Sequence, residues 1–390
     1  MRETLPGKPR VLITHYLPNM ISGAELAIAD FVAGADGQFD YIMLTPGEGS
    51  LSDYYRKRGF EVWTHRLETR RRKYPGLHSL QSYIFARLLR EKKIDVVLCN
   101  TFAAASRSRT ACRLARIPYA IYVREYISDK AIHRQILAEA DKIYVVSHDL
   151  KNHLSPMVDP TKVLVAYDPI DAHQIVERVK AHRASGVRLV PFGLVHPIVG
   201  MVGRITPFKQ QDLFVRAAAA VLSTIPEARF VVAGAAQEAE KDYEAYVFEL
   251  AKSLKVQDKI AFLGQRPDAI EVMSEFTVAC LASSREPLGR VILEAHLIGL
   301  PVIVPNTGGA AETVEDGATG LVFHATGPDA TNQLADRIVR LLKDAGLRNA
   351  LAAKAKLKIE DTFAGQQHIR QLEQYLQALS GEKAVAHRGR

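Results

Sequence analysis

The second half of the chain opens with the stretch Ile198-Val199-Gly200-Met201-Val202-Gly203-Arg204-Ile205-Thr206-Pro207-Phe208-Lys209. Its first residues form an apolar run, which favours a buried strand. A glycine and a cationic loop follow, and a helical pattern begins near Gln210. Strand, loop and helix in this order are the repeating unit of a parallel α/β sheet. We therefore expect Arg204 and Lys209 at the carboxyl end of a strand, where such sheets bind ligands.

The same alternation of apolar runs and amphipathic stretches occurs in both halves of the chain. At 390 residues the chain exceeds the size at which a single core keeps growing. We therefore predict an α/β protein with two Rossmann-like, parallel-sheet domains. The predicted strands are 10–14, 41–44, 62–63, 96–98, 119–123, 143–146 and 163–165 in the first half, and 198–202, 230–233, 260–263, 278–281, 302–304 and 321–323 in the second.

Turn residues at Pro191, Gly193 and Pro197 indicate the domain boundary. We expect an N-terminal domain at 1–190 and a C-terminal domain at 191–363. The amphipathic segment 364–380 predicts a helix that packs back on the first domain. Residues 381–390 are expected to form a disordered tail.

Composition points to a cytoplasmic protein. Hydrophobic residues make up 47% of the chain, but no run approaches the roughly 18 apolar residues of a membrane span. The first residues lack the apolar core of a signal peptide. Cys99, Cys112 and Cys280 lack the spacing of a metal site or a disulfide framework, so we expect reduced thiols in the core.

The formal net charge of +8 is concentrated in two basic clusters. Five cations lie between residues 66 and 73, and a second group runs from Arg87 to Lys93. Such clusters are attracted to anionic lipid, which predicts a peripheral membrane contact through residues 66–93. A solvated loop and helix face is the alternative. No zinc finger, RNA-recognition sequence or aromatic-basic stripe is present, so no nucleic-acid partner is expected.

Two carboxylates are eight positions apart in Ser284-Arg285-Glu286-Pro287-Leu288-Gly289-Arg290-Val291-Ile292-Leu293-Glu294-Ala295. Pro287 and Gly289 predict that Glu286 lies in a loop and Glu294 one turn inside a helix. Arg and Lys suit a diphosphate, and a carboxylate suits a ribose diol. The alternatives are an acid beside a helix N-terminus with an ordinary helical Glu, or a glycosidase pair.

Two glycine-containing turns are further candidates. Thr307-Gly308-Gly309 follows a predicted strand and offers backbone N–H groups to a phosphate or a sugar. A plain strand-to-helix turn is the alternative reading. Gly23 opens a helix after the first strand of the chain.

Absent motifs exclude several classes of enzyme. The first strand is not followed by G-x-G-x-x-G, which argues against a dehydrogenase. The chain also lacks G-x-x-x-x-G-K-[ST], H-E-x-x-H and G-x-S-x-G, so ATPase, zinc peptidase and serine hydrolase chemistry lose support. Since no D-x-D pair is present, we expect no metal and no cofactor.

The chain resembles the retaining glycosyltransferases of family 4, which have the two-domain GT-B fold. The segments that carry the resemblance are Gly203 to Lys209, Gly264 to Pro267, the E-x7-E run from Glu286 to Glu294, Gly299 to Val302 and Asp316 to Gly320. The resemblance implies an interdomain cleft, an acceptor-binding first domain and a donor-binding second domain. It also implies a C-terminal helix that crosses back to the first domain.

The resemblance assigns roles to individual residues. Arg204 and Lys209 would hold the diphosphate, Glu294 the ribose and Glu286 the donor sugar. Other donor contacts are implied at Gly23, Gly203, Arg266, Leu288, Gly289, Arg290 and Thr307. The implied substrates are a nucleoside-diphosphate sugar as donor and a glycan, lipid-linked or small-molecule acceptor.

The first domain departs from the family pattern. Ser22-Gly23 stands where paired glycines are usual, and Arg124 stands where members usually have a histidine that contacts the donor sugar. An ion pair between Arg124 and Glu125 that shapes the acceptor pocket is one interpretation. The predicted activity is sugar transfer with retention. The alternatives are a catalytically silent binding or assembly partner, and a phosphorylase or sugar-nucleotide epimerase of the same fold.

Overall fold

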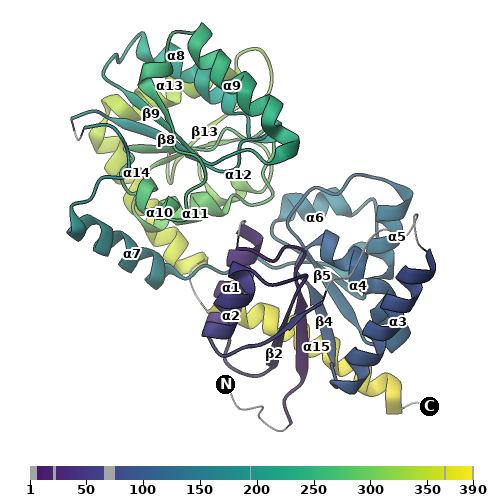
Figure 1. Ribbon diagram of the computed structural model, residues 1–390. Helices are drawn as coiled ribbons and strands as arrows, with labels where there is room; N and C mark the ends of the chain where they lie inside the picture. The colour runs from purple at the N-terminus through teal and green to yellow at the C-terminus, as the bar shows by residue number, and fades with distance from the viewer. Residues whose placement is uncertain (1–6, 21–22, 66–74, 194, 364–365, 389–390) are drawn as a thin grey trace. The chain divides into compact units, whose positions relative to one another are not determined.

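The computed structural model describes residues 7–20, 23–65, 75–193, 195–363 and 366–388, with the backbone alone at 75–78 and 382–388. The chain divides into two compact units. Unit 1 is Met1–Pro169 with Gly365–Arg390, and unit 2 is Ile170–Ala364. Each unit is a parallel sheet with helices on both faces (Figure 1). The predicted fold class, α/β with two Rossmann-like domains, is confirmed.

The sheet of unit 1 has seven parallel strands in the order β3-β2-β1-β4-β5-β6-β7. Leu12, Val97 and Ile121 on its central strands are fully buried because helices cover both faces. The strands are β1 Arg10–Thr14, β2 Asp40–Thr45, β3 Glu61–Thr64, β4 Val96–Cys99, β5 Tyr119–Val123, β6 Lys142–Val145 and β7 Val163–Val165. The helices are α1 Gly23–Gly34, α2 Ser50–Lys57, α3 Pro75–Glu91, α4 Phe102–Ala115, α5 Ala131–Glu139, α6 His148–Leu154 and α15 Gln367–Arg388.

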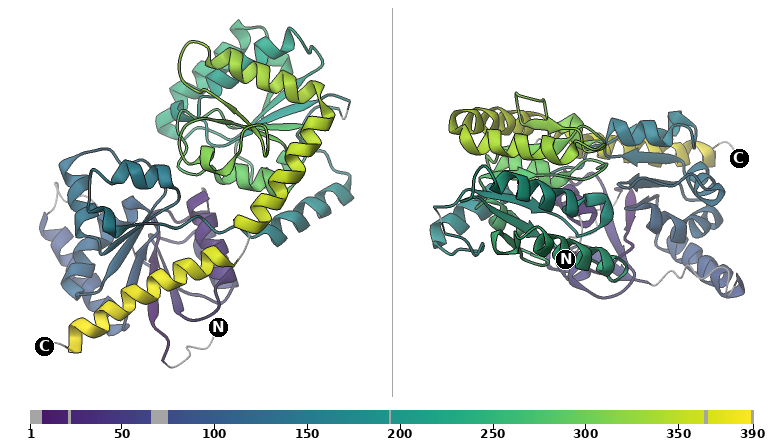
Figure 2. Two further views of the ribbon diagram at one scale, coloured as in Figure 1. Left: turned by 180° about the vertical axis from the view of Figure 1, so that it is seen from behind. Right: turned by 90° about the horizontal axis from the view of Figure 1, so that it is seen from above.

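The C-terminal helix α15 lies across one face of the sheet of unit 1 (Figure 2). The hydroxyl of Tyr41 donates to Oε1 of Glu373 at 3.1 Å. The rings of Tyr144 and Tyr375 stack with their centroids 5.4 Å apart. The helix runs on to Arg388, so the prediction of a disordered tail at 381–390 was wrong for the described residues. The segment Glu382 to Ala386 is made of residues that a helix tolerates well, so the helix continues past Gly381.

The sheet of unit 2 has six parallel strands in the order β10-β9-β8-β11-β12-β13. One apolar cluster, which includes Phe214 and Phe230, and a second, which includes Leu281 and Ile292, pack around this sheet. The strands are β8 Ile198–Val202, β9 Arg229–Ala233, β10 Ile260–Phe262, β11 Val278–Cys280, β12 Val302–Pro305 and β13 Leu321–Phe323. The helices are α7 Ala172–Ser185, α8 Gln211–Leu222, α9 Lys241–Ser253, α10 Ala269–Met273, α11 Arg290–Leu297, α12 Ala310–Thr313, α13 Ala330–Lys343 and α14 Ala345–Thr362.

The division between the units falls at Pro169, earlier than the predicted boundary after residue 190. The reason is α7, which belongs to unit 2. Arg178 on α7 forms an ion pair with Glu271 on α10, with Nη2 and Oε2 2.7 Å apart. The turn residues after 190 therefore mark a loop inside unit 2 and not the passage between the units.

The cysteines behave as predicted. Cys99, Cys112 and Cys280 are all free and buried. Burial raises the pKa of the Cys99 thiol to about 12, so this group stays protonated near neutral pH.

Candidate functional site

The strand order of unit 2 places a topological switch point between β8 and β11. From β8 the chain proceeds through β9 to β10 on one side, and from β11 through β12 to β13 on the other. The loops that leave the carboxyl ends of β8 and β11 therefore diverge. Parallel sheets bind their ligands in the crevice that such loops leave between them.

The structure brings together one cation and one carboxylate of the predicted site. Lys209 ends the loop after β8, and Glu286 lies in the loop after β11. Their side chains form an ion pair with Nζ and Oε2 2.6 Å apart, and each side chain is 13% exposed. The hydroxyl of Ser283 also donates to Oε2 of Glu286, at 2.9 Å. The pair is thus held in a partly buried position.

Backbone hydrogen bonds join three loops around this pair. The N–H of Ser284 donates to the carbonyl of Phe208 at 2.8 Å, which links the loops after β11 and β8. The N–H of Gly309 donates to the carbonyl of Glu286 at 2.7 Å, and the hydroxyl of Thr307 donates to the carbonyl of Ser284 at 2.7 Å. These two bonds attach the loop after β12. The three loops therefore form one connected rim.

Two glycines allow the loops around the Lys209–Glu286 pair to pack closely. A Cβ atom added to Gly234 would lie 1.9 Å from the carbonyl oxygen of Gly203, so the loops after β8 and β9 pack backbone to backbone. Gly289 precedes α11 with φ of 81°, a conformation that disfavours residues with a side chain. Its ideal Cβ position is 3.4 Å from Cγ of Glu286. Gly289 thus permits the turn that separates the two carboxylates.

Glu294 lies one turn inside α11, as predicted. Nε of Arg290 donates to its Oε1 at 2.9 Å, and both side chains are 12% exposed. Leu288, just before the helix, is buried with 3% exposure. Each carboxylate of the E-x7-E run therefore has its own cationic neighbour, Lys209 for Glu286 and Arg290 for Glu294.

The other two predicted cations differ in their surroundings. Arg204 is exposed, and its guanidinium makes no hydrogen bond or ion pair with the residues that the structure describes. Arg266 follows β10 and binds both oxygens of Asp268, at 2.7 and 2.6 Å. These bonds hold the pKa of the Asp268 carboxyl below its usual value. Arg204 is thus available to a ligand, whereas the guanidinium of Arg266 already has a partner.

Two residues that support the loops of this site were not predicted from the sequence. Gln211 is fully buried, donates to the carbonyl of Arg204 at 2.9 Å and accepts from the N–H of Thr206 at 3.3 Å. Ser283 is the second. A serine three residues before Glu286, just after a buried strand, is a signal that was open to sequence reasoning. A glutamine at the start of a helix gives no such signal.

The remaining predicted residues, Gly23, Arg124 and Glu125, belong to unit 1. Gly23 is the first residue of α1, and Arg124 directly follows β5. Nε of Arg124 binds Oδ1 of Asp168 at 2.7 Å, with side-chain exposures of 9% and 6%. The prediction of Glu125 as the ion-pair partner of Arg124 was wrong, because folding brings Asp168 beside Arg124.

Arg124 also acts on His15 through Asn100. Its Nη1 donates to Oδ1 of Asn100 at 2.7 Å, so Nδ2 of Asn100 faces Nδ1 of His15, 3.2 Å away, as a donor. The other ring nitrogen of His15 lies 3.3 Å from the hydroxyl of Tyr55. Burial, with a smaller contribution from Arg124, lowers the pKa of His15 to about 3. His15 is therefore neutral at physiological pH.

Comparison with known proteins indicates the class of protein to which this chain is similar. The model of a family described as Glycosyltransferase Family 4 matches residues 21–174, and that of Glycosyl transferases group 1 matches residues 193–358. The fold also resembles the crystal structure of HepE from Anabaena in complex with UDP and glucose. That likeness has a TM-score of 0.79 at 20% identity, over 95% of this chain and 100% of that one.

Named relatives agree with this class. The D-inositol 3-phosphate glycosyltransferase of Actinosynnema mirum is 34% identical over 232 residues, which are 57% of this chain and 54% of that protein. The N-acetyl-alpha-D-glucosaminyl L-malate synthase of Bacillus anthracis is 25% identical over 63% of this chain and 62% of that protein. The chain thus spans little more than half the length of the curated relatives it matches.

Two parallel-sheet units and a switch-point site in unit 2 define a protein of the GT-B class. Since the two family models match in tandem along most of its length, the chain is similar to the family 4 glycosyltransferases.

Proposed function

We propose that this protein transfers a sugar from a nucleoside-diphosphate sugar to an acceptor, with retention of configuration at the anomeric carbon. The observation that carries the proposal is the pair of Lys209 and Glu286, held by three joined loops at the switch point of unit 2. A partly buried ammonium beside a carboxylate suits a substrate that offers both phosphate oxygens and sugar hydroxyls.

The donor is proposed to lie along the rim of unit 2. Lys209 and Arg204 offset the charge of the diphosphate, Glu286 accepts hydrogen bonds from the sugar hydroxyls, and Glu294 accepts from the ribose diol. Backbone N–H groups of Leu288 to Arg290 and of the Thr307 loop contact the phosphate or the sugar. Gly203 allows close approach of the donor, and the backbone near Arg266 meets the base.

The chemical step needs little from the protein besides position and charge. The leaving phosphate oxygen takes the proton of the acceptor hydroxyl on the same face of the sugar, and the new glycosidic bond forms as the bond to phosphate breaks. Lys209 stabilises the negative charge that grows on the diphosphate. No metal ion and no cofactor take part in this scheme.

The donor class draws support from the solved relatives, since HepE of Anabaena was crystallised with UDP and with UDP-glucose. The acceptor is proposed to be a glycan or a lipid-linked or small-molecule hydroxyl compound in the cytoplasm. Polysaccharide assembly is the corresponding cellular role. Peripheral membrane contact through 66–93 also stays a proposal, and its part 66–74 lies outside the described residues.

A catalytically silent binding partner is the second candidate. The observation behind it is Arg124, whose guanidinium is bound to Asp168 and Asn100 at the position where the family resemblance implies a histidine.

The test is incubation with UDP-, GDP- and ADP-sugars and a panel of acceptors, followed by mass spectrometry of the products. We expect a glycoside whose anomeric configuration matches that of the donor. A product of inverted configuration would contradict the retaining mechanism. Nucleotide binding without any product would favour the silent partner.

A further inference from the structure

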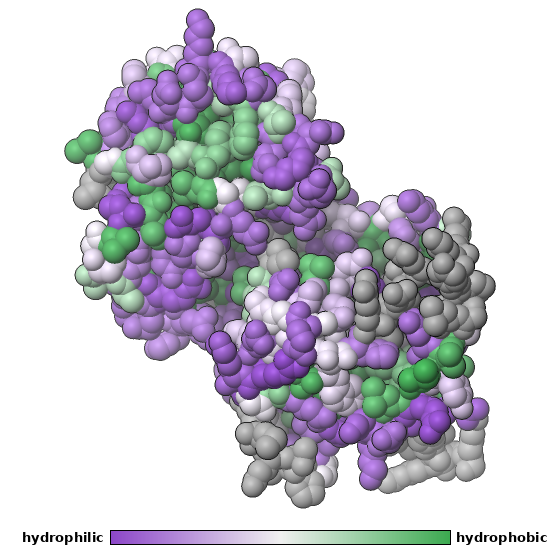
Figure 3. Space-filling view, in the orientation of Figure 1, coloured by the Kyte–Doolittle hydropathy of each residue, from purple (hydrophilic) through white to green (hydrophobic). Residues whose placement is uncertain are grey.

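The solvent-facing side of α3 in unit 1 is unusually apolar. Leu80, Tyr83 and Ile84 are 55%, 54% and 50% exposed, and their spacing places them on one stripe of the helix. Figure 3 shows hydrophobic side chains gathered over this helix. The opposite side of α3 packs into the core through Phe85 and Leu89, both fully buried. The exposed stripe is therefore separate from the side through which α3 packs into the core.

Cationic side chains lie next to the apolar stripe on the exposed side of α3. Arg87 and Arg90 follow Ile84 on the exposed side, and the chain then continues through exposed Lys92 and Lys93. Helix α4, which packs beside α3, ends with three further exposed residues: Arg113, Leu114 and Arg116.

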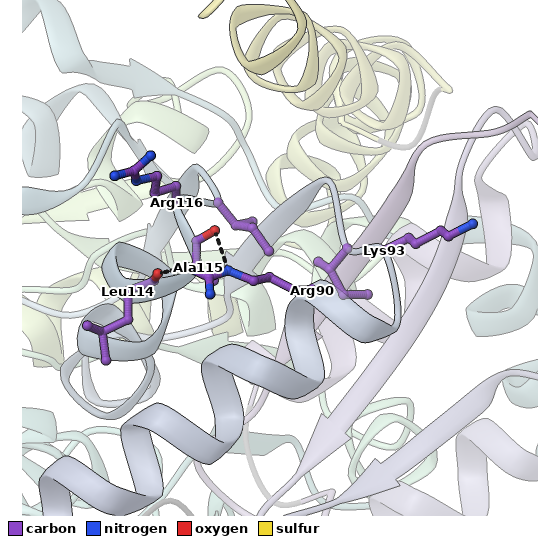
Figure 4. A pocket seen from close by; sticks show the side chains of 7 residues that line it. Arg90, Lys93, Leu114, Ala115 and Arg116 are labelled. Atoms are coloured by element: carbon purple, nitrogen blue, oxygen red, sulfur yellow. Dashed lines mark hydrogen bonds between the residues drawn. The ribbon is translucent and has the colours of Figure 1, made fainter. Parts of the chain in front are cut away.

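A depression of about 490 Å³ lies between the ends of these two helices. Arg90 reaches across it and donates to the carbonyls of Leu114 and Ala115 at the end of α4 (Figure 4). Lys93 and Arg116 extend on opposite sides of Arg90 in this view. Neither of these two side chains makes a hydrogen bond or ion pair with the residues that the structure describes, and no acidic residue lines the depression.

We infer that this face, formed by the exposed sides of α3 and the end of α4, docks on an anionic phospholipid surface. The apolar stripe would enter the boundary between headgroups and acyl chains, with Tyr83 suited to that depth. The unpaired cations would contact lipid phosphates. Within the described residues no helix is long and apolar enough to cross a bilayer, so the contact would be peripheral.

Charge complementarity favours lipid over another copy of this chain. Arg87, Lys93, Arg113 and Arg116 would face their own counterparts in a symmetric pair of copies, with Glu91 as the one exposed acid of the stripe. Like charges brought together in this way disfavour self-association.

The experiment is sedimentation with vesicles of phosphatidylcholine alone or mixed with phosphatidylglycerol. We expect binding to the mixed vesicles, weaker binding at high salt and much weaker binding to phosphatidylcholine alone. The triple variant R87Q/K93Q/R116Q should lose about fivefold in affinity for each charge removed, from ~1 kcal/mol per cation. The variant L80Q/I84Q should lose about tenfold for each side chain, since both would leave the apolar boundary.

Matched controls come from unit 2, where R340Q/K343Q/K354Q removes three exposed cations and L357Q one exposed apolar side chain. The controls should retain more of the vesicle binding than the variants on the α3 face. Nucleotide binding by unit 2, followed as a thermal shift, should persist in every variant and shows that the proteins are folded.

Three results would overturn the inference. The first is equal vesicle binding by wild type, R87Q/K93Q/R116Q and L80Q/I84Q. The second is no binding to phosphatidylglycerol vesicles at all. The third is self-association without lipid that L80Q/I84Q abolishes, which would make the face a contact between copies. Because lipid binding belongs to unit 1 and nucleotide binding to unit 2, failure of one readout does not imply failure of the other.

Discussion

Lys209 and Glu286 form the ion pair at the centre of the proposed donor site. Their charged atoms are 2.6 Å apart, so neither group lies unpaired in a partly buried position. A donor that offers both an anion and hydroxyl groups can satisfy both side chains. In the proposed site Arg204, which is exposed and whose guanidinium makes no hydrogen bond or ion pair with the described residues, would then add a second cation to the diphosphate.

Replacing Lys209 by alanine should lower kcat/KM for the nucleotide sugar by a hundred- to a thousandfold, or about 2.7–4 kcal/mol. The reason is the loss of one preorganised cation that stabilises negative charge in the transition state. Steady-state kinetics measures the effect. Lys343→Ala, which removes an exposed lysine of α13, is the matched control and should keep full activity. Full turnover by Lys209→Ala would refute the role of Lys209.

Arg124→Ala should destabilise unit 1 by about 3 kcal/mol, since Asp168 would be left buried without its partner. The double variant Arg124→Met/Asp168→Leu removes both charges and should recover much of that loss. Urea denaturation of the three proteins measures the difference. If the double variant is less stable than Arg124→Ala, the ion pair is not the cause.

At this scale the sequence predicted the residues that lie in motifs and missed their partners. Glu286 and Lys209 could be named because each follows a recognisable strand. Asp168 could not, since it lies 44 residues from Arg124 and only the parallel pairing of β5, β6 and β7 brings it near. Contact between distant residues is a property of the fold and leaves no local pattern.

Among the elements, α11 carries both a residue of the proposed donor site and a buried histidine. Glu294 lies on this helix, and two residues later His296 is fully buried with no hydrogen-bond partner for either ring nitrogen among the described residues. Burial, and to a lesser extent Lys358, lowers the pKa of His296 to about 3. His296 is therefore buried in its neutral form.

This burial predicts a dependence of stability on pH. Below the unfolded pKa of about 6.5 the unfolded chain binds a proton that the folded chain refuses, so stability falls as the pH falls from about 6.5 towards 3. By pH 5 each such histidine, His15 or His296, should lower the free energy of unfolding by about 2 kcal/mol. The stability of His296→Met should fall less than that of the wild type between pH 7 and pH 5. Thermal unfolding of both proteins at the two pH values measures this difference. An unchanged sensitivity would contradict the assignment.

Helix α15 is the second element with a testable role. A chain that ends at 366 should unfold unit 1 at a lower temperature, because Leu372, Leu376 and Leu379 are buried and each contributes roughly 1.5–3 kcal/mol. A chain that ends at 381 keeps these residues and is the control. Equal melting temperatures for the full chain and the chain that ends at 366 would show that α15 is not part of the core of unit 1.

The elements were predictable to a large extent. Runs such as Ile198–Val202 and Tyr119–Val123 are apolar throughout because their sheets are covered on both faces, and that pattern is visible in sequence. The unit to which α7 belongs was not predictable in this way. It depends on the bonds of Arg178 and His182 to α10 and its neighbour Glu275, which no periodicity reveals.

For the whole molecule, two repeated patterns of strand and helix were enough to predict two Rossmann-like units. The GT-B class came from the resemblance of the motifs in the second half of the chain to those of the family 4 glycosyltransferases. Donor, acceptor and linkage depend on side chains that no shared motif defines, so they could not be predicted from the sequence.

The most direct measurement is a calorimetric titration of the full chain with UDP, GDP and ADP, beside the variants Lys209→Ala and Glu294→Gln. We expect at least one nucleotide to bind the wild type and both variants to bind it at least about tenfold more weakly, because each loses a charge-assisted hydrogen bond of about 1.5–3 kcal/mol. Wild-type protein that binds none of the three nucleotides, or variants that bind as tightly as the wild type, would contradict this expectation.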